Sequence, residues 1–526
     1  MMHSLVLLLC ALHAVHPLTI GLDLGTTVSS IAHLNPVTKL PVLIAKTRSR
    51  VLIAQSDGQV TVPPFAASEP TALYSLKSFT RKTYAKLDKQ ITIPGLAPPS
   101  DSDGDDFLRF TPHRYDVTTL QSHVVSHLFE SLDSAPSGIV ACVPALFTGE
   151  QKEATIETVN LAFSRAFGDA AALPKCKILT EPEACCLAYS AHSPPLSKED
   201  LGVSAEKTKL VFDFGGGTLD VSVVVVGYRS NGTPAGVEVI ATMGNVALGG
   251  DDMSDRLASH LRKKYGGDGW SLLAEEARVK LSSSKSLSYL VGSDGPKGLG
   301  ISDFEEAPQD VDGELELPAG MQLVTVTRAD FEQSIKDLVP RLINPVRQIA
   351  VLADVALLGD ARPGKFDNFF DDDEDDGGDV DEQQDWRNLK KLQKGKRKGA
   401  REKEDRMKSY SQTKSKIELM ISNANPNEKI TLKDAPGSRP LDEVILCGGS
   451  SKTPLVLKLL WSLTGLMPTY IPGVSPDDAV SLGAAVQCGI FDGVFEDDDD
   501  DEGGFGVMTP IQAALMRALA KKEGLI

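Results

Sequence analysis

One local pattern occurs twice in the chain and constrains its fold: an apolar run that ends in aspartate, a glycine turn, a threonine and a second apolar run. The copies read GLDLGTT at 21–27 and LVFDFGGGTLDVSVV at 210–224. Glycine lets backbone N–H groups approach a phosphate without a Cβ in the way, and threonine hydroxyls add donors. Two such hairpins, about 190 residues apart, indicate an internal duplication. We therefore expect two facing phosphate loops that hold a nucleotide triphosphate between two lobes.

The glycine spacing excludes two other kinds of nucleotide loop. The sequence has no G-x-x-x-x-G-K-[ST] loop, and strands flank each glycine turn on both sides, unlike a dinucleotide fingerprint. Asp23 and Asp213 end their strands where a carboxylate can hold Mg²⁺ through water. A third glycine turn contains Gly448, Gly449 and Ser450. It either lets a flat base or ribose lie against the backbone or is a tight turn between a strand and a helix.

Strand and helix patterns alternate along the chain. Predicted strands cover 18–33 with a break at the glycine turn, 138–144, 177–180, 209–226 and 444–446. Predicted helices cover 116–132, 150–167, a segment from 182, 251–265, 271–281, 454–464 and a long helix over 330–358 that is kinked at Pro340 and Pro345. This alternation predicts an α/β architecture.

In their order along the chain, these motifs resemble the ATPase domain of the 70-kDa heat-shock chaperones, in the actin-like superfamily. Further matching segments are VPALFTGEQKEAT at 143–155, ILTEPEACCLAY at 178–189, LGGDDMSDRL at 248–257 and SPDDAVSLGAAVQCGI at 475–490. The resemblance covers about 18–360 and 441–492. It implies an α/β actin-like fold in which two lobes, each a mixed sheet with flanking helices, surround a central nucleotide cleft for ATP or ADP with Mg²⁺.

The resemblance also divides the chain into parts. Lobe I is expected at 18–206, and lobe II at 207–361 together with 440–492. The segment 362–439 has an acidic block followed by a basic block and is expected to be a disordered charged insertion. The tail 493–526 is acidic and then predicts a short helix that begins at Thr509, with apolar residues at helical spacing. We expect that helix to dock onto its own domain.

Roles for individual residues follow from the same resemblance. The catalytic positions are Lys77, near the γ-phosphate and the attacking water; Glu181, Asp213 and Asp220, around that water and Mg²⁺; and Thr218, which matches a phosphate contact. The metal positions are Asp23 and Asp213. Nucleotide-binding positions are Gly25, Thr26, Thr27, Gly215, Gly216, Gly217, Gly249 and Gly250, and, for adenosine, Glu275, Arg278, Ser282, Gly448, Gly449, Ser450, Lys452 and Asp477. Pro144 matches a proline that relays the nucleotide state between lobes. Catalysis of this kind depends on positioning and charge neutralisation.

The sequence departs from the family pattern at three positions near the nucleotide. Val28 replaces an aromatic residue, Val279 replaces a basic residue, and Lys452 replaces an arginine. Lysine presents no planar group to stack on adenine. The segment 36–68 is also shortened. We therefore expect the triphosphate contacts to be complete and the adenine contacts to be altered.

About 34 residues follow Asp492, too few for a peptide-binding sandwich of ~100 residues. The chain is similar to short family members of the microsome-associated ATPase-core type. The expected function is a chaperone-type ATPase that assists protein folding or quality control, with unfolded proteins and a co-chaperone (a J-domain protein or a nucleotide-exchange factor) as partners. The alternative is a non-catalytic, ATP-bound regulator of partner chaperones. A sugar kinase of the same superfamily is a third candidate, but no sugar-site pattern supports it.

Charge and the N-terminal residues bear on partners and location. The net charge is −18, with acidic runs at 371–376 and 496–502, so we expect no nucleic-acid binding. The apolar run LVLLLCALHAV at 5–15 is too short for a transmembrane span, which needs ~20 residues. It has the length of a signal-peptide core, so 1–17 is predicted to be a signal peptide and the location the endoplasmic reticulum lumen. The alternative is an apolar N-terminal strand in a cytoplasmic protein.

Overall fold

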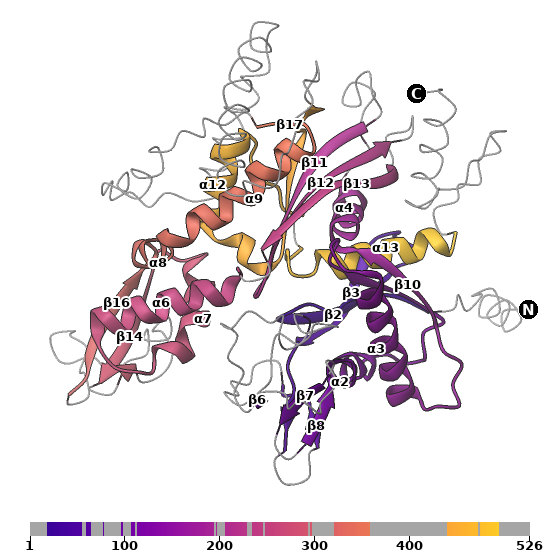
Figure 1. The fold of residues 1–526 in the computed structure, drawn as a ribbon, viewed down its shortest axis with the longest axis horizontal. Coiled ribbons are helices and arrows are strands. Elements are labelled where there is room, and N and C mark those ends of the chain that lie inside the picture. The colour runs from indigo at the N-terminus through magenta and orange to yellow at the C-terminus, as the bar shows by residue number, and fades with distance from the viewer. Residues whose placement is uncertain are drawn as a thin grey trace, which may run out of the picture. The chain divides into compact units, whose positions relative to one another are not determined.

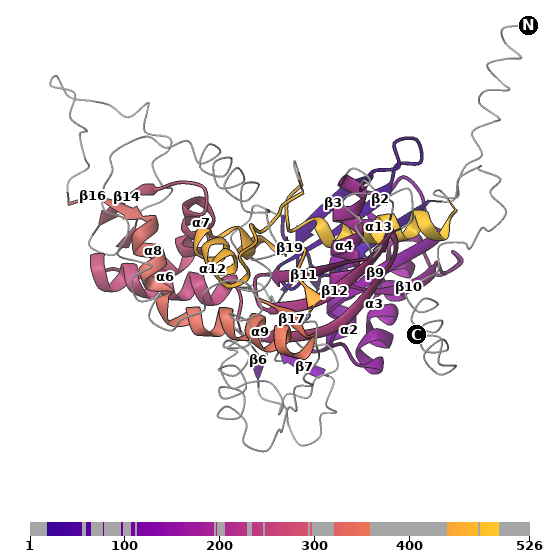
Figure 2. The same ribbon diagram turned by 90° about the horizontal axis from the view of Figure 1, so that it is seen from above.

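The computed structural model describes residues 18–54, 59–64, 77, 96–97, 107–110, 113–193, 196, 206–228, 234–245, 248–292, 295–296, 320–357, 439–471 and 474–493. The chain forms two compact units (Figures 1 and 2). Unit 1 comprises Met1–Asp200, Tyr228–Glu238 and Ile471–Ile526, and unit 2 comprises Leu201–Gly227 and Val239–Tyr470. The predicted signal peptide, nearly all of the predicted insertion and the tail after 493 lie outside the described residues.

Unit 1 is built on a five-stranded mixed sheet with the strand order β10–β9–β1–β2–β3. Its strands are β1 (Thr19–Asp23), β2 (Val28–Leu34), β3 (Pro41–Arg48), β9 (Gly138–Val143) and β10 (Lys175–Thr180). The pairs β1–β2 and β2–β3 are antiparallel, whereas β9 runs parallel to both β1 and β10. Short strands add two small sheets: β4 (Leu52–Ile53) with β5 (Val60–Thr61), and β6 (Leu96–Ala97), β7 (Phe107–Phe110) and β8 (His113–Asp116).

Alternating side chains of β1 bury both faces of this sheet. Ile20 and Leu22 point into a core with α2 (Val117–Phe129) and α3 (Gly149–Phe167). Gly21 points to the other face, where α13 (Ala479–Phe491) packs; a Cβ on Gly21 would lie 2.4 Å from the backbone nitrogen of Ala485. Helix α13 also packs against α4 (Glu181–His192) and β2, so a glycine at position 21 permits the close approach of helix and strand.

Unit 2 is built on a four-stranded sheet with the order β13–β12–β11–β19. The strands are β11 (Glu206–Phe214), β12 (Leu219–Tyr228), β13 (Pro234–Asn245) and β19 (Glu443–Cys447). The other elements are α6 (Gly250–Tyr265), α7 (Trp270–Leu281), β14 (Ser286–Gly292), β15 (Gly295–Pro296), β16 (Gln322–Thr327), α8 (Arg328–Ser334), η4 (Lys336–Leu338), α9 (Val339–Leu352), β17 (Val355–Ala356), β18 (Arg439–Pro440), η5 (Gly449–Lys452) and α12 (Pro454–Thr464). One apolar core, which includes Phe212, Trp270 and Phe331, joins the sheet to these helices.

The two sheets repeat one arrangement, which confirms the predicted duplication. In each, a hairpin is extended by a parallel strand on the side of its first strand. Asp23 pairs across its hairpin with Ser30, and Asp213 pairs with Asp220, so the partner follows seven residues later in both copies. The α/β fold predicted from the alternation of strands and helices is likewise confirmed.

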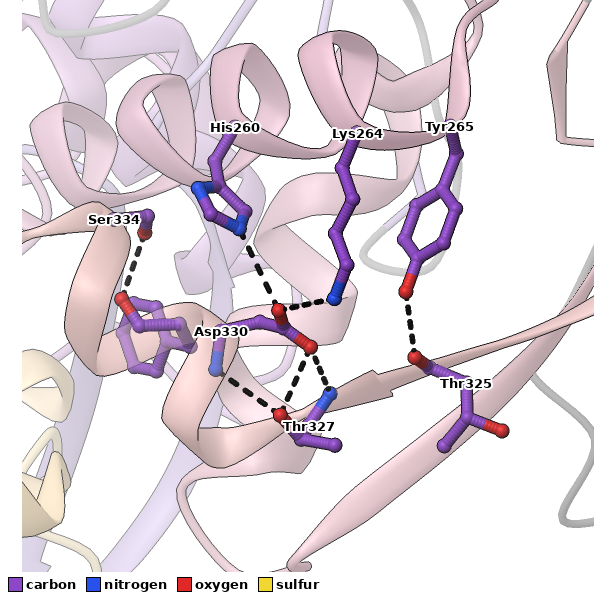
Figure 3. A network of polar contacts seen from close by, with 8 residues as sticks. His260, Lys264, Tyr265, Thr325, Thr327, Asp330 and Ser334 are labelled. Carbon is purple, nitrogen blue, oxygen red and sulfur yellow. Dashed lines mark hydrogen bonds and ion pairs between the residues drawn. The ribbon is translucent and has the colours of Figure 1, made fainter.

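Helix α8 begins with a network of polar contacts that joins it to α6 and β16 (Figure 3). Thr327 is the N-cap, and its hydroxyl accepts a hydrogen bond from the Asp330 N–H while the Asp330 carboxylate accepts from Thr327. Lys264 Nζ lies 2.5 Å from Asp330 Oδ1, and His260 Nε2 lies 3.5 Å from the same oxygen. Tyr265 donates to the Thr325 carbonyl at 2.8 Å. These contacts hold three elements of unit 2 together.

The prediction of one long helix over 330–358 is wrong. The segment contains the end of α8, the turn η4, α9 and the strand β17. Pro340 lies in the first turn of α9, where its missing N–H removes no helical hydrogen bond, and it therefore starts a helix. Pro345 lies inside α9. None of the helices in the described part of the chain has the length and apolar composition needed to cross a bilayer.

The position of α13 also differs from the expected division into lobes. We assigned 440–492 to lobe II, yet the residues from Ile471 onward group with unit 1. The side chain of Ser30 in β2 donates to Ser481 in α13 at 2.8 Å. A Cβ on Gly483 would lie 1.7 Å from the Ala184 carbonyl oxygen of α4. Helix α13 is thus packed into unit 1 at distances that only glycine allows.

Candidate functional site

In unit 1, the predicted metal-binding carboxylate of Asp23 lies at the end of β1 and is 8% exposed. Its pKa is raised to about 7, first by burial, with Lys77 lowering it and Glu181, Asp477 and Asp478 raising it. Burial is therefore the main cause of the raised pKa, and Lys77 opposes it more strongly than any one of the three carboxylates adds to it. A divalent cation would favour the ionised form of this carboxylate, so the residues present fit a Mg²⁺ ion.

Two predicted catalytic residues of unit 1 lie in direct contact. Lys77 donates a hydrogen bond to Glu181 Oε1, and both side chains are almost buried. Glu181 is the first residue of α4, directly after β10. A carboxylate is favoured at that position because the helix N-terminus carries partial positive charge. The fold therefore places this ion pair beside Asp23, on whose carboxylate both charges act.

The turn between β1 and β2 contains three predicted phosphate contacts: Gly25, Thr26 and Thr27. A Cβ on Gly25 would lie 2.0 Å from the Val28 carbonyl oxygen, so this turn requires glycine. The Thr27 carbonyl accepts a hydrogen bond from Ser49 N–H at 2.8 Å, which ties the turn to the end of β3. After β9, the Pro144 carbonyl accepts from Phe147 N–H at 3.1 Å.

In unit 2, the glycine turn after β11 contacts the start of α6. Gly215 N–H donates to the Thr218 carbonyl at 3.1 Å, which closes the turn. Gly250 N–H donates to the Gly215 carbonyl at 3.0 Å. A Cβ on Gly249 would lie 2.1 Å from the Gly216 carbonyl oxygen. The predicted glycine positions of the two motifs therefore form one cluster at the N-terminus of α6, where the N–H groups of Gly250 and Asp251 bond the carbonyls of Gly215 and Gly216.

Asp213 and Asp220 are opposite each other where the β11–β12 hairpin ends. A Cβ on Gly448 would lie 2.8 Å from Asp213 Oδ1, and one on Gly244 would lie 2.5 Å from Asp220 Oδ1. Gly448 has a φ of +72°, a conformation that favours glycine. The carboxylates of Asp213 and Asp220 therefore lie against the backbone of Gly448 and Gly244, at positions where a side chain would collide with them.

The predicted adenosine positions Arg278 and Ser450 meet in unit 2. Arg278 is 6% exposed; its Nη1 donates to the Ser450 hydroxyl at 3.4 Å and its Nε to the Ser254 hydroxyl at 3.1 Å. Gly250 lies against the same pair, since a Cβ there would be 2.3 Å from Ser450 Oγ. One buried guanidinium therefore joins α6, α7 and the turn after β19.

The remaining adenosine positions fall into different surroundings. Ser282 follows α7, and its hydroxyl donates to the Arg278 carbonyl at 3.0 Å. Glu275 lies near Asp251, whose pKa is raised to about 7 by burial first and then by Glu275, with Arg278 lowering it. Lys452 lies in η5 with Gly449 and Ser450. Asp477, which we grouped with these residues, belongs to unit 1, where its charge acts on Asp23.

Sequence reasoning missed three residues of this site. Ser254 lies within the quoted LGGDDMSDRL motif, but only the fold shows that it accepts from Arg278. Asp478 follows Asp477 and acts on Asp23, and Lys46 of β3 lies 3.3 Å from Asp478 Oδ1. The paired acids in SPDD were a usable signal for Asp478. No local pattern marked Lys46.

The donor sets favour a metal held mainly through water and phosphate oxygens. Among the described residues, no cluster of three or more histidines, cysteines or carboxylates could hold a metal ion directly. Mg²⁺ commonly keeps several waters and binds one or two carboxylates together with substrate phosphates. Asp23 and Asp213, each at the end of a strand beside a glycine turn, are suited to that mode of binding.

Comparison with known proteins agrees with this geometry. The chain matches the family model described as "Hsp70 protein" over residues 104–358 and 397–500, more than half of its length. The second matched segment begins inside the predicted insertion and ends beyond 492, so the family match is wider there than the resemblance we described. The match includes most of the candidate site residues, although Asp23, Gly25, Thr26, Thr27 and Lys77 precede it.

Curated relatives extend over most of the chain. It is 25% identical over 518 residues to "Chaperone protein dnaK" of Cyanidioschyzon merolae, covering 90% of this chain and 62% of the relative. It is also 25% identical over 514 residues to "Heat shock 70 kDa protein 6, chloroplastic" of Arabidopsis thaliana (91% and 53%) and over 523 residues to "Stromal 70 kDa heat shock-related protein, chloroplastic" of Pisum sativum (92% and 55%). The chain thus spans about half to three-fifths of the length of these relatives.

Proposed function

Because the chain belongs to the Hsp70 protein family, whose ATPases have an actin-like fold, we propose that it binds Mg-ATP and hydrolyses it as a chaperone-type ATPase. The observation that carries this proposal is the repeated hairpin: Asp23 and Asp213 end equivalent strands beside glycine turns with the same register. In unit 2 the turn is also bonded to the N-terminus of α6. A carboxylate at a strand end and a glycine turn that lets the backbone approach closely are features that suit a metal-bound triphosphate.

Each group in the site has a role in this proposal. In unit 1, Asp23 would hold the hydrated metal, and the turn at 25–27 would donate hydrogen bonds to phosphate oxygens. In unit 2, Asp213 and the turn at 215–218 are the equivalent groups, and a bound metal would neutralise phosphate charge. Arg278 and Ser450 border the adenosine. In unit 1, Lys77 and Glu181 would orient the attacking water, and the Glu181 carboxylate would accept its proton. In unit 2, Asp220 is the corresponding acidic position, and the Thr218 hydroxyl would donate to a phosphate oxygen. Positioning and charge, with little covalent chemistry, would then account for the rate.

Single-turnover hydrolysis tests the proposal. The chain is mixed with less than one equivalent of radiolabelled ATP, and the release of phosphate is followed in the native chain and in Lys77→Ala. We expect hydrolysis in the native chain and a loss of about a hundredfold or more in the variant, the range found for a single positioned catalytic group. Equal ATP affinity in the two chains, measured by calorimetry, would show that Lys77 acts on the reaction.

The same experiment separates the alternative function. A chain that binds ATP tightly but releases no phosphate is a nucleotide-bound regulator of partner chaperones. Two adenosine-side residues differ from the family pattern: Val279, which is exposed on α7, and Lys452 in η5. This difference supports the alternative function. Unfolded proteins and a J-domain protein or nucleotide-exchange factor are the proposed partners, and pull-down with the chain in its ATP and ADP states tests them.

We also propose entry into the endoplasmic reticulum lumen, because the apolar run at 5–15 has the length of a signal-peptide core. The names of two relatives place those proteins in chloroplasts, so the experiment must distinguish organelles. A C-terminal tag protected from protease in isolated microsomes supports the proposal. A tag digested in every membrane fraction, with Met1 still present, would place the chain in the cytoplasm.

A further inference from the structure

An open groove on α3 of unit 1 has no role in the proposed nucleotide site. Its volume is about 370 Å³. Its apolar lining comes from Ile156 and Leu161 of α3 and from Leu173, which precedes β10, while Glu153 and Glu157 add carboxylates. Glu153, Glu157 and Leu161 follow one another at a spacing of four, and Ile156 lies three residues after Glu153, so these residues form one stripe along α3.

This stripe faces away from the core of unit 1. The opposite side of α3 buries Val159, Ala162 and Phe163 against the sheet and α2. On the groove side, Leu161 is 39% exposed and Leu173 is 55% exposed. Apolar side chains flanked by carboxylates are the complement of an amphipathic helix with a basic edge, which binds a groove through residues at i, i+4 and i+7.

The sequence of this chain contains a segment with that pattern. In TPIQAALMRALAKKEGL at 509–525, apolar residues stand at Ile511, Leu515, Ala518 and Leu519, and Lys521 beside that face and Lys522 at its C-terminal end give it a basic flank. We propose that residues 509–525 dock as an amphipathic helix in the α3 groove of the same chain. The leucines cover Ile156, Leu161 and Leu173, and the basic flank faces Glu153 and Glu157.

The end of α13 lies close enough for this docking. Lys177 of β10 lies 3.3 Å from the ring centre of Phe491, the last residue of α13, and α3 packs against β10. These elements are neighbours in both views (Figures 1 and 2). The segment 494–508 that follows can extend roughly 50 Å, about twice the ~28 Å length of α3. The acidic run at 496–502 carries the same charge as Glu153 and Glu157 of the groove and would be repelled by them. Residues 509–525, which carry basic side chains, are therefore the part of the tail that fits the groove.

Hydrogen exchange of the full-length chain, read by mass spectrometry, tests the proposal from both sides. The groove variant is Leu161→Asp with Leu173→Asp, and the segment variant is Leu515→Asp with Leu519→Asp. The matched control is Leu146→Asp, a leucine that is 57% exposed and lies outside the groove. All three substitutions of unit 1 are at exposed positions, and unchanged melting temperatures confirm that the variants remain folded.

We expect residues 509–525 to exchange slowly in the native chain and in the control, and about tenfold faster or more in the groove variant, because burial of leucine is lost. The segment variant should accelerate exchange of the groove-facing amides of α3. Reversing the charges, with Glu153→Lys and Glu157→Lys, should weaken protection, and Lys521→Glu with Lys522→Glu should restore it. Fast exchange of 509–525 in the native chain, or equal exchange in groove variant and control, overturns the proposal. Protection that disappears on dilution overturns it too, because the occupant is then a second copy.

Discussion

Arg278 Nη1 donates a hydrogen bond to Ser450 Oγ at 3.4 Å, although the two residues are 172 positions apart in the chain. The guanidinium is buried and also bonded to Ser254. A planar, fully ionised group that donates in two directions holds α7 at a set distance from both α6 and the turn after β19. This contact gives the adenosine side of the proposed site its shape, and it can be tested directly.

Arg278→Lys is expected to weaken ATP binding about tenfold. Lysine keeps the charge, but its single nitrogen cannot occupy the positions of both Nε and Nη1, so one of the two serine hydroxyls loses its partner at a cost of ~1–3 kcal/mol. Isothermal calorimetry with ATP measures the change. Arg256→Lys is the matched control, because Arg256 forms a solvent-exposed pair with Asp337. Equal losses in both variants would show that the effect is not specific to the site.

Asp213→Asn is expected to weaken Mg-dependent ATP binding by about tenfold or more, since the amide lacks the charge that holds a hydrated metal. Calorimetry with Mg²⁺ and then with EDTA measures the effect. Removal of the metal should weaken binding to the native chain and bring the two proteins to similar affinities. An unchanged affinity of the variant in Mg²⁺ would remove Asp213 from the site.

Gly249→Ala is expected to lower ATP affinity about tenfold or more, because the new Cβ would lie 2.1 Å from the Gly216 carbonyl and force the turn away from α6. Overpacking of this kind costs ~1–3 kcal/mol. Gly149→Ala, at the start of α3, is the control, since no atom lies within 4 Å of the new Cβ. Circular dichroism and ATP titration of both variants make the comparison. Normal affinity in Gly249→Ala would contradict the assigned role of the turn.

Asp330→Asn is expected to destabilise unit 2 by ~1–3 kcal/mol near pH 7. Burial raises the pKa of Asp330, but hydrogen bonds from Lys264 and Thr327 outweigh it and lower the pKa below the ordinary value. The charged form therefore stabilises the fold above the unfolded-state pKa, and this contribution is lost as the pH falls through the folded-state value. Urea unfolding of both proteins from pH 7 to pH 3 should show the difference shrinking with acid. Asp337→Asn, in an exposed ion pair, should change stability by less than ~1 kcal/mol.

Removal of residues 371–396 is expected to leave ATP affinity unchanged. The segment lies between the two ranges that match the family model. Exposed ion pairs between its acidic and basic residues contribute only ~0–1 kcal/mol each. ATP titration of the shortened chain, beside a chain with a neutral linker of the same length, is the measurement. A lost ATP site in the shortened chain alone would give this segment a role in binding.

The sequence alone determined the features that depend on neighbouring residues. The glycine turns after Asp23 and Asp213, the strands around them and the helix Pro454–Thr464 were predictable because glycine, proline and apolar spacing act within a few residues. The roles of Lys77, Glu181, Arg278 and Ser450 came from the family resemblance, which paired none of them. Only the fold shows that Lys77 contacts Glu181 and that Arg278 contacts Ser450.

Only the tertiary structure decided which distant segments meet. It divided the segment 330–358 into α8, η4, α9 and β17, although the local apolar spacing suits one helix. It packed α13 into unit 1, placed Asp477 and Asp478 beside Asp23, and brought Ser254 to Arg278. It also left Leu161 and Leu173 exposed on one groove. The physical reason is that the residues that bury a side chain or bond to it come from distant parts of the chain. The spacing of apolar residues indicates which side of a helix or strand is apolar, but not which segment covers that side.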